Sequence, residues 1–240
     1  YGGDFQYYLI KLLKPLQDSY INDSSKCTRI AIIEMTFFHY LEWKNMKCFK
    51  QSINKDPKIL ADLINIVFRK DHSKNIDQSQ IDINKISNLY SLYHKIEFCP
   101  TETGGDVKKP ELEFWINQLI GYLKENDQLT LFGMVVGRLF AFSPAGQDEH
   151  MPCEAVRELI EIYSDQSMQQ EFCATIINSR GAFSPSAGKE EKKMAERFKN
   201  NAEYLVLNGY PKTAEIYYNL AHNYFSESLA YREDAEHGRL

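Results

Sequence analysis

The chain lacks the residue patterns that usually identify a catalytic or metal-binding site. Its five cysteines are spread along the chain and form no CxxC pair, so neither a zinc knuckle nor a dithiol redox motif is present. Its six histidines are isolated, and none belongs to an HExxH motif or a similar metal-ligand spacing. These absences predict that the protein has no cofactor and no structural metal, and they favour a non-enzymatic function.

Long uninterrupted hydrophobic runs are also missing. The most apolar stretch, residues 129–142, is broken by Gly133, Gly137 and Arg138, so we expect no transmembrane helix and no membrane partner. The N-terminus has no signal-peptide pattern, and the dispersed cysteines suit a reducing compartment, so we expect a cytoplasmic location. The first residue is Tyr1 rather than Met, which favours processing or excision from a longer protein.

A phosphate-binding loop is absent as well. Residues 180–189 end in Gly188-Lys189, as such a loop does. The loop also requires Gly where Phe183 stands, and Ser or Thr where Glu190 stands. We therefore expect no bound nucleotide.

Positive charge is not in excess. The net charge is −5, which disfavours nucleic acid as a general partner. Basic residues are nevertheless concentrated in residues 44–74, where Lys44, Lys47 and Lys50 alternate with aromatic and sulfur-containing side chains. That composition suits single-stranded nucleic acid or another anion. These lysines form a candidate anion-binding site and the alternative functional hypothesis, although a solvated loop near a helix end has the same composition.

The chain is rich in signals for helix starts. Prolines stand where helices should begin at Pro57, Pro110, Pro152 and Pro211 and, less cleanly, at Pro185. Proline suits the first helical turn because its fixed φ is helical and its missing N–H would have no partner there. After the first four prolines, apolar residues recur every three or four positions. The pattern predicts an all-α fold of about ten helices, with helical hairpins stacked as an α-solenoid-like array or an irregular bundle.

The order of these signals predicts how the helices follow one another. In the first part we expect helices at 4–21, 24–43, from Pro57 onward, and from a cap at Asp82 to about residue 98. We expect Pro15 to kink or divide the first helix, and a basic loop to separate the second helix from the third. In the second part the predicted helices form three pairs: 110–125 with 128–142, 152–163 with 166–179, and 187–207 with 211–237.

Residues 99–109 interrupt this series with a proline, two glycines and several polar residues. Such a composition is typical of a linker or an exposed loop. We therefore expect an N-terminal helical subdomain over 1–98 and a C-terminal helical-hairpin subdomain over 110–240.

Two glycines mark one helix of the second part as buried. Gly133 and Gly137 lie about one helical turn apart in an apolar stretch that also holds Leu139 and Phe140. Small residues at this spacing allow two helices to approach closely. We expect these four residues on a buried helix.

A cluster of reactive residue types precedes one predicted helix. Asp148, Glu149 and His150 stand close to Cys153 at a loop-to-helix junction. A helix N-terminus favours a thiolate, so the cluster supports a third hypothesis, a thiol-based enzyme near His150 and Cys153. Acidic residues that simply favour the helix dipole explain the same cluster without chemistry.

Part of the final hairpin resembles a known repeat family. Residues 209–221, Gly-Tyr-Pro-Lys-Thr-Ala-Glu-Ile-Tyr-Tyr-Asn-Leu-Ala, resemble part of a tetratricopeptide repeat, but the flanking helix lacks that family's Trp and Gly-Tyr pattern. From about Phe132 onward the chain also resembles the C-terminal helical region of large bacterial multidomain proteins. Residues 152–160, 178–181 and 210–214 carry that similarity. Neither resemblance supplies a catalytic residue.

The last helix carries more aromatic residues than one packing face requires. Tyr217, Tyr224 and Tyr231 are spaced by seven and share one stripe, whereas Tyr218 and Phe225 form a second stripe about 100° away. We take Tyr218 and Phe225 as candidate partner-binding residues; the competing interpretation is that the chain itself covers both stripes.

The leading hypothesis is a protein-interaction or scaffold region of a larger cytoplasmic protein. It would bind a protein partner, a neighbouring domain or a second copy, as a homo-oligomer.

Overall fold

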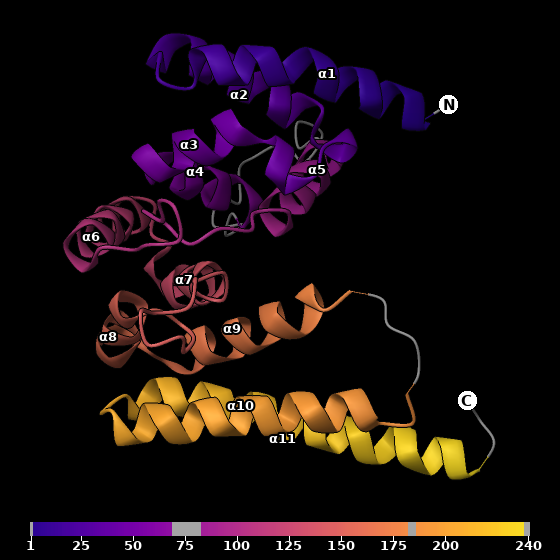
Figure 1. Cartoon of the computed structure of the whole chain (residues 1–240). Coiled ribbons are helices and arrows are strands. Elements are labelled where there is room, and N and C mark those ends of the chain that lie inside the picture. Colours follow the sequence, from indigo (N-terminus) through magenta and orange to yellow (C-terminus); the bar gives the residue numbers. More distant parts are fainter. Residues whose placement is uncertain (1, 69–82, 182–185, 238–240) are drawn as a thin grey trace. The chain divides into compact units, whose positions relative to one another are not determined.

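The computed structural model describes residues 2–68, 83–181 and 186–237, and the described part is all-α, as predicted (Figure 1). It contains eleven α-helices, and its only strand-like pairing is an isolated bridge between Thr103 and Asp106. The predicted cap at Asp82 and the predicted helix opening at Pro185 lie outside the described residues.

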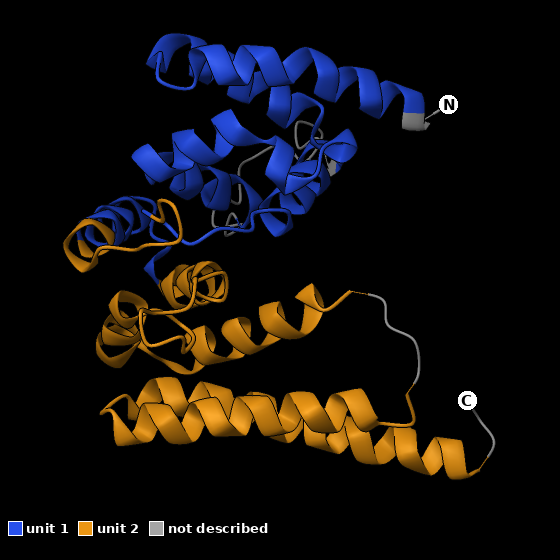
Figure 2. Cartoon of the chain, in the orientation of Figure 1, with its two compact units in different colours: residues 1–101, 114–129 blue, residues 102–113, 130–240 orange. Residues whose placement is uncertain are grey.

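The chain divides into two compact units, residues 1–101 with 114–129 and residues 102–113 with 130–240 (Figure 2). The first unit contains α1 (Gly2–Tyr20), α2 (Ser24–Thr36), η1 (Phe38–Tyr40), η2 (Trp43–Asn45), α3 (Lys47–Lys55), α4 (Lys58–Val67), α5 (Ile83–His94) and most of α6 (Lys109–Glu125). The second unit contains α7 (Phe132–Phe140), α8 (Glu154–Tyr163), α9 (Gln166–Ser179), α10 (Lys189–Leu207) and α11 (Pro211–Glu236). The short helix η4 (Leu129–Leu131) spans the boundary.

These units do not coincide with residues 1–98 and 110–240, because most of α6 packs within the first unit. Trp115 of α6 is buried, and its indole N–H donates to the carbonyl of Ile53 at 3.2 Å. Buried apolar residues at 116, 119 and 123 continue the same face of the helix. That residues 99–109 act as a linker stays a prediction.

The proline signals located helix starts correctly. A helix begins within two residues of each of Pro57, Pro110, Pro152 and Pro211. Pro211 is the first residue of α11, where the N–H that proline lacks would have no hydrogen-bond acceptor within the helix.

The first unit differs from the sequence-based expectations in three places. Pro15 lies inside α1, which continues undivided to Tyr20, so the division of this helix that was one of the two predicted outcomes does not occur. The second helix ends at Thr36 rather than at residue 43, and short 3-10 turns follow it. The expected basic loop is α3, a helix with Cys48, Phe49 and Ile53 buried on one side.

A buried carboxylate explains why α3 forms. Glu34 of α2 is fully buried and accepts hydrogen bonds from the backbone N–H groups of Cys48 and Phe49, at 3.1 and 2.7 Å. These are two of the orphan donors in the first turn of α3, which has no cap of its own. The amide of Gln17 in α1 also donates to Glu34, at 2.7 Å. One side chain therefore joins three helices of the first unit.

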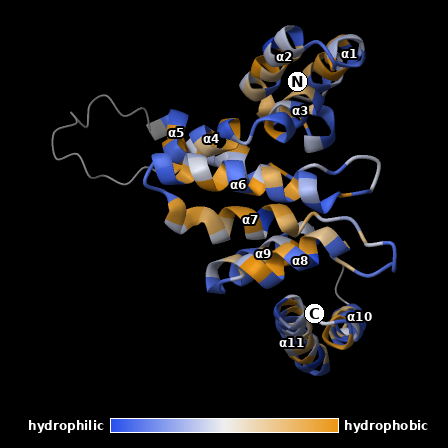
Figure 3. Ribbon diagram, turned by 90° about the vertical axis from the view of Figure 1, so that its left-hand side faces the viewer, coloured by the Kyte–Doolittle hydropathy of each residue, from blue (hydrophilic) through white to orange (hydrophobic). Residues whose placement is uncertain are grey.

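In the second unit, α7 packs against α9. Gly133, Gly137, Leu139 and Phe140 are all buried on α7, which confirms their predicted placement, and Figure 3 shows mainly hydrophobic colours along this helix. A Cβ at Gly137 would collide with the backbone of Met168 in α9. This close approach makes α7 the main neighbour of α9, so the predicted pairing of 152–163 with 166–179 is wrong.

We predict that Gly137→Ala destabilises the protein by about 1–3 kcal/mol, because the new methyl group must displace the backbone at Met168. Gly121→Ala in α6 is the matched control, since its Cβ would meet no atom within 4 Å. There, alanine should stabilise the helix by about 0.5–1 kcal/mol. Urea unfolding of both variants measures the difference. Equal effects would contradict the close approach of α7 to α9.

We predict that Glu34→Ala destabilises the protein by about 2–4 kcal/mol, because it leaves two backbone N–H groups and the Gln17 amide without their acceptor. Burial raises the pKa of Glu34, so its carboxyl group holds a proton more tightly in the folded state than in the unfolded chain. Wild-type stability should therefore fall as the pH rises from about 4.5 through the raised pKa, whereas Glu34→Gln should lack that loss. Urea unfolding at several pH values tests both points.

Candidate protein-interaction surface

The helices α10 and α11 form an antiparallel hairpin, and α11 extends past the start of α10 (Figure 1). At the turn, Gly209 has a φ of +84°, and the N–H of Tyr210 donates to the carbonyl of Leu205 at 2.9 Å. This is the left-handed conformation in which a glycine commonly ends a helix. At the other end, Gly188 has a φ of +78°, and any Cβ there would collide with the backbone carbonyl of Ser228.

One face of α11 belongs to the core of the second unit. Tyr217 and Tyr224 are almost fully buried, and their rings lie 5.9 and 5.5 Å from the ring of Phe198 in α10. The ring of Phe172 in α9 lies 6.0 Å from Tyr217. Burial raises the pKa of Tyr217, so its phenol stays neutral. This face is therefore fixed within the unit.

The second stripe of α11 is exposed. Tyr218, Phe225 and Leu229 expose 41, 47 and 45% of their surfaces. Tyr218 and Phe225, together with Lys192 and Lys199 of α10, line a hollow of about 390 Å³ between the two helices. Phe225, Leu229 and Lys192 line a second hollow, of about 600 Å³. Since Lys192 and Phe225 line both, the two hollows are adjacent, and we call them together the α10–α11 groove.

The charged residues of the α10–α11 groove are mainly basic. Its charged lining residues are Lys189, Lys192, Glu196, Lys199, Arg232 and Glu236. Four basic residues therefore stand against two acidic ones, in a chain whose net charge is −5. The groove combines an apolar floor with a basic wall along α10.

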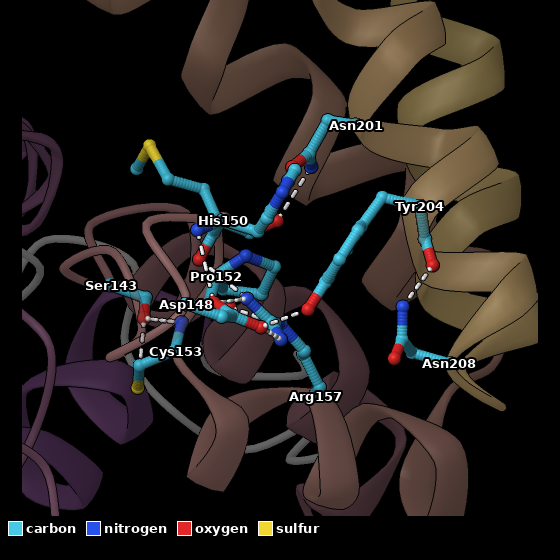
Figure 4. Close-up of polar contacts among 10 residues, drawn as sticks. Ser143, Asp148, His150, Pro152, Cys153, Arg157, Asn201, Tyr204 and Asn208 are labelled. Atoms are coloured by element: carbon cyan, nitrogen blue, oxygen red, sulfur yellow. Dashed lines mark hydrogen bonds and ion pairs between the residues drawn. The ribbon is translucent and has the colours of Figure 1, made fainter.

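A buried arginine holds the loop that precedes α8 (Figure 4). Arg157 is 1% exposed and donates to both carboxylate oxygens of Asp148, at 2.5 and 2.9 Å. It also donates to the backbone carbonyls of His150 and Pro152, both at 2.5 Å. The Arg157 guanidinium holds the pKa of Asp148 well below its usual range. This bidentate pair fixes residues 148–152 against α8.

The same loop is joined to α10. The Tyr204 hydroxyl donates to Asp148 at 2.9 Å, and the Tyr204 ring stacks on His150, with centroids 3.5 Å apart. The Asn201 amide donates to the carbonyl of Met151 at 2.6 Å, which leaves its oxygen to accept from the Nδ1–H of His150 at 3.0 Å. Figure 4 shows Asn201 and Tyr204 pointing from α10 into the loop. We call this set of contacts the loop lock.

Two further carboxylates fix the ends of the hairpin. Glu161 of α8 accepts from the backbone N–H groups of Lys212 and Thr213, at 3.1 and 2.8 Å, and so caps the start of α11. Glu191 of α10 is fully buried and pairs with Arg180, which follows α9, at 2.5 Å. The hairpin is therefore held at both ends by charged contacts.

The structure joins His150 and Cys153 to different partners. Cys153 is 5% exposed; its sulfur accepts from the Ser143 hydroxyl at 3.3 Å, and its N–H donates to that hydroxyl at 3.1 Å. The His150 ring contacts Asn201 and Tyr204. These contacts stabilise the loop, and they give no support to the hypothesis of a thiol-based enzyme.

The candidate anion-binding lysines lie on η2 and α3, and two of them pair with acids. Lys44 contacts Glu42 at 2.6 Å, and Lys47 contacts Asp18 of α1 at 2.7 Å. Lys50 lies on α3 and is partly buried. Lys44 and Lys47 line one hollow of about 390 Å³ together with Lys14 of α1, and its lining does not include Lys50. Anion binding by these lysines stays a prediction.

Leu229 and Lys192 were missed as site residues in the sequence. Tyr218, His222, Phe225, Leu229 and Arg232 follow one another by four and three positions, and this spacing could have extended the stripe to Leu229. The basic wall could not be found this way, because identifying it requires knowing which face of α10 packs toward α11.

Comparisons with known proteins leave the class of the protein open. No family model, no curated protein and no solved structure matches the chain. Both resemblances noted in the sequence therefore stay predictions. Across the residues that the structure describes, no helix has the length and hydrophobicity to cross a membrane. In the same residues, no three His, Cys, Asp or Glu side chains are grouped to hold a metal ion.

We predict that Asp148→Asn destabilises the protein by about 2–4 kcal/mol, because it leaves the buried Arg157 guanidinium without its counter-charge. The lowered pKa of Asp148 stabilises the fold above pH 3.8, and this contribution is lost as the pH falls toward the lowered pKa. The variant should therefore lose less stability than wild type below pH 3.8. Urea unfolding over an acidic pH series measures both effects. Unchanged stability at neutral pH would contradict the role given to the ion pair.

Proposed function

We propose that the chain is a non-enzymatic protein-interaction region and that the α10–α11 groove is its binding surface. The observation that carries the proposal is the exposure of Tyr218, Phe225 and Leu229 along one stripe of a helix whose neighbouring stripe, with Tyr217 and Tyr224, is buried. Contiguous apolar surface of this kind is typical of interaction sites, and aromatic side chains are enriched at the residues that dominate binding energy.

The alternative hypothesis of nucleic-acid or anion sensing through residues 44–74 has less support. Lys44 and Lys47 have carboxylate partners within the unit, and an anion would have to compete with these carboxylates. The acidic net charge of the chain also opposes a general affinity for nucleic acid.

Site-specific photo-crosslinking in cells tests the proposed surface. We expect a benzophenone side chain at position 218 or 225 to give discrete covalent adducts with another protein. Leu207 is the matched control position, because it is 86% exposed and apolar, lies on the same hairpin and is absent from the lining of both hollows. Adducts of equal yield at 207, or their absence at 218 and 225, would contradict the proposal.

We predict that Tyr218→Ser combined with Phe225→Ser changes stability by less than about 1 kcal/mol, because both side chains are already half exposed. The same pair should abolish the adduct formed by a benzophenone at Leu229. A large loss of stability would instead assign the second stripe to the core.

A further inference from the structure

We infer that the partner element in the α10–α11 groove is an acidic amphipathic α-helix. The inference rests on the proposed function and specifies the occupant of the same surface. The spacing of the exposed stripe, the length of the groove and the charges along its α10 wall carry it.

The stripe has the spacing of a helix-packing seam. Tyr218, Phe225, Leu229 and Arg232 recur by about seven and three or four positions, as do the contact positions of two helices packed side by side. From Tyr218 to Arg232 the groove is about 21 Å long, which matches about four turns of a bound helix. A helix laid in the groove would convert the α10–α11 hairpin into a three-helix arrangement. This is the helix-in-groove mode of recognition.

The basic wall defines the chemistry of the occupant. Lys189, Lys192 and Lys199 stand along α10, and Glu196 is the one acidic residue of α10 that lines the groove. Arg232 on α11 is paired with Glu236 at 3.0 Å and Lys199 on α10 with Glu203 at 3.7 Å, so among the described residues the excess positive charge of the groove lies at Lys189 and Lys192, on the α10 side. A bound helix would place one flank against these lysines. That flank should carry Asp or Glu, and the flank toward α11 need not.

The same charges argue against a second copy as the occupant. Two copies joined groove to groove would bring two basic walls into one interface, and like charges across an interface weaken association. An acidic helix meets the wall with opposite charge. Electrostatic complementarity therefore favours a different protein over a homodimer.

Designed peptides test the inference with the intact chain. The probe is a fluorescent helical peptide of about 18 residues, with Leu every three or four positions and Glu beside the apolar stripe. A matched peptide carries Lys in place of each Glu, and a scrambled peptide keeps the composition without the stripe. By anisotropy we expect the acidic peptide to bind about tenfold more tightly than the basic one at low salt, and the difference to shrink at high salt.

Variants of the chain then locate the binding. Phe225→Ser should weaken the acidic peptide by about tenfold or more, whereas Leu207→Ser should leave it unchanged. Lys192→Glu with Lys199→Glu should remove the preference for the acidic peptide, and a circular dichroism melt checks that this variant is folded. The acidic peptide should also suppress the photo-adducts at position 225.

Each other outcome overturns the inference in a distinguishable way. Equal binding of acidic and basic peptides would refute the acidic occupant while leaving the interaction surface intact. A dimer in sedimentation velocity that Phe225→Ser dissociates would assign the groove to a second copy. If no peptide binds but adducts still form at 218 and 225, only the helical occupant is refuted. If no peptide binds and no adducts form, the proposed function is refuted as well.

Discussion

The second unit depends on the burial of one cation. Arg157 is 1% exposed, and removing a guanidinium from water is unfavourable unless nearly every donor finds an acceptor. The chain meets this requirement by folding residues 148–152 over α8, so that Asp148 and two backbone carbonyls surround the guanidinium. The requirement extends further, because Asp148 also accepts from Tyr204. A local need for hydrogen bonds thereby positions α10, and with it one wall of the groove.

Both units use carboxylates to cap helices that lie far away in the sequence. Glu34 caps α3 from α2, and Glu161 caps α11 from α8. Local caps also occur: Asp23 starts α2 and Asp165 starts α9. The distant caps connect neighbouring helices as well as satisfying their first turns, so each stabilises tertiary structure and secondary structure at once.

This difference between local and distant caps explains which parts of the fold could be predicted. Helix starts at Pro57 and Pro211 follow from the conformation of proline, a property of the residue itself. The helix α3 was predicted as a loop because its first turn depends on Glu34, which lies fourteen positions before Cys48. The pairing of α7 with α9 was missed for a related reason. The glycines indicate that a close neighbour exists, and they do not indicate which helix it is.

The candidate site was predictable to a similar extent. A seven-residue spacing identifies Tyr218 and Phe225 as a stripe of their own, since helix geometry alone separates them from Tyr217 and Tyr224. The burial of one stripe and the exposure of the other depend on α9 and on Phe198 of α10, which sequence spacing does not reveal. In the same way, the sequence shows the lysines at 44–50 but does not show which acidic residues pair with them.

The buried stripe of α11 fixes the helix in the core, and the exposed stripe is therefore held in place for binding. Because Tyr217 and Tyr224 are fixed in the core, the exposed stripe is presented on a helix that does not have to become ordered when a partner arrives. A preorganised surface loses less entropy on binding. The close contact of Gly188 with Ser228 marks where α10 begins beside α11, so among the described residues the helix α10 borders the groove only up to about Ser228. A bound helix is desolvated most completely in the part that α10 borders, around Phe225, and binding energy concentrates where water is excluded. We therefore expect the proposed helix to make its most favourable contacts beside Lys192, where the basic wall and the apolar floor meet.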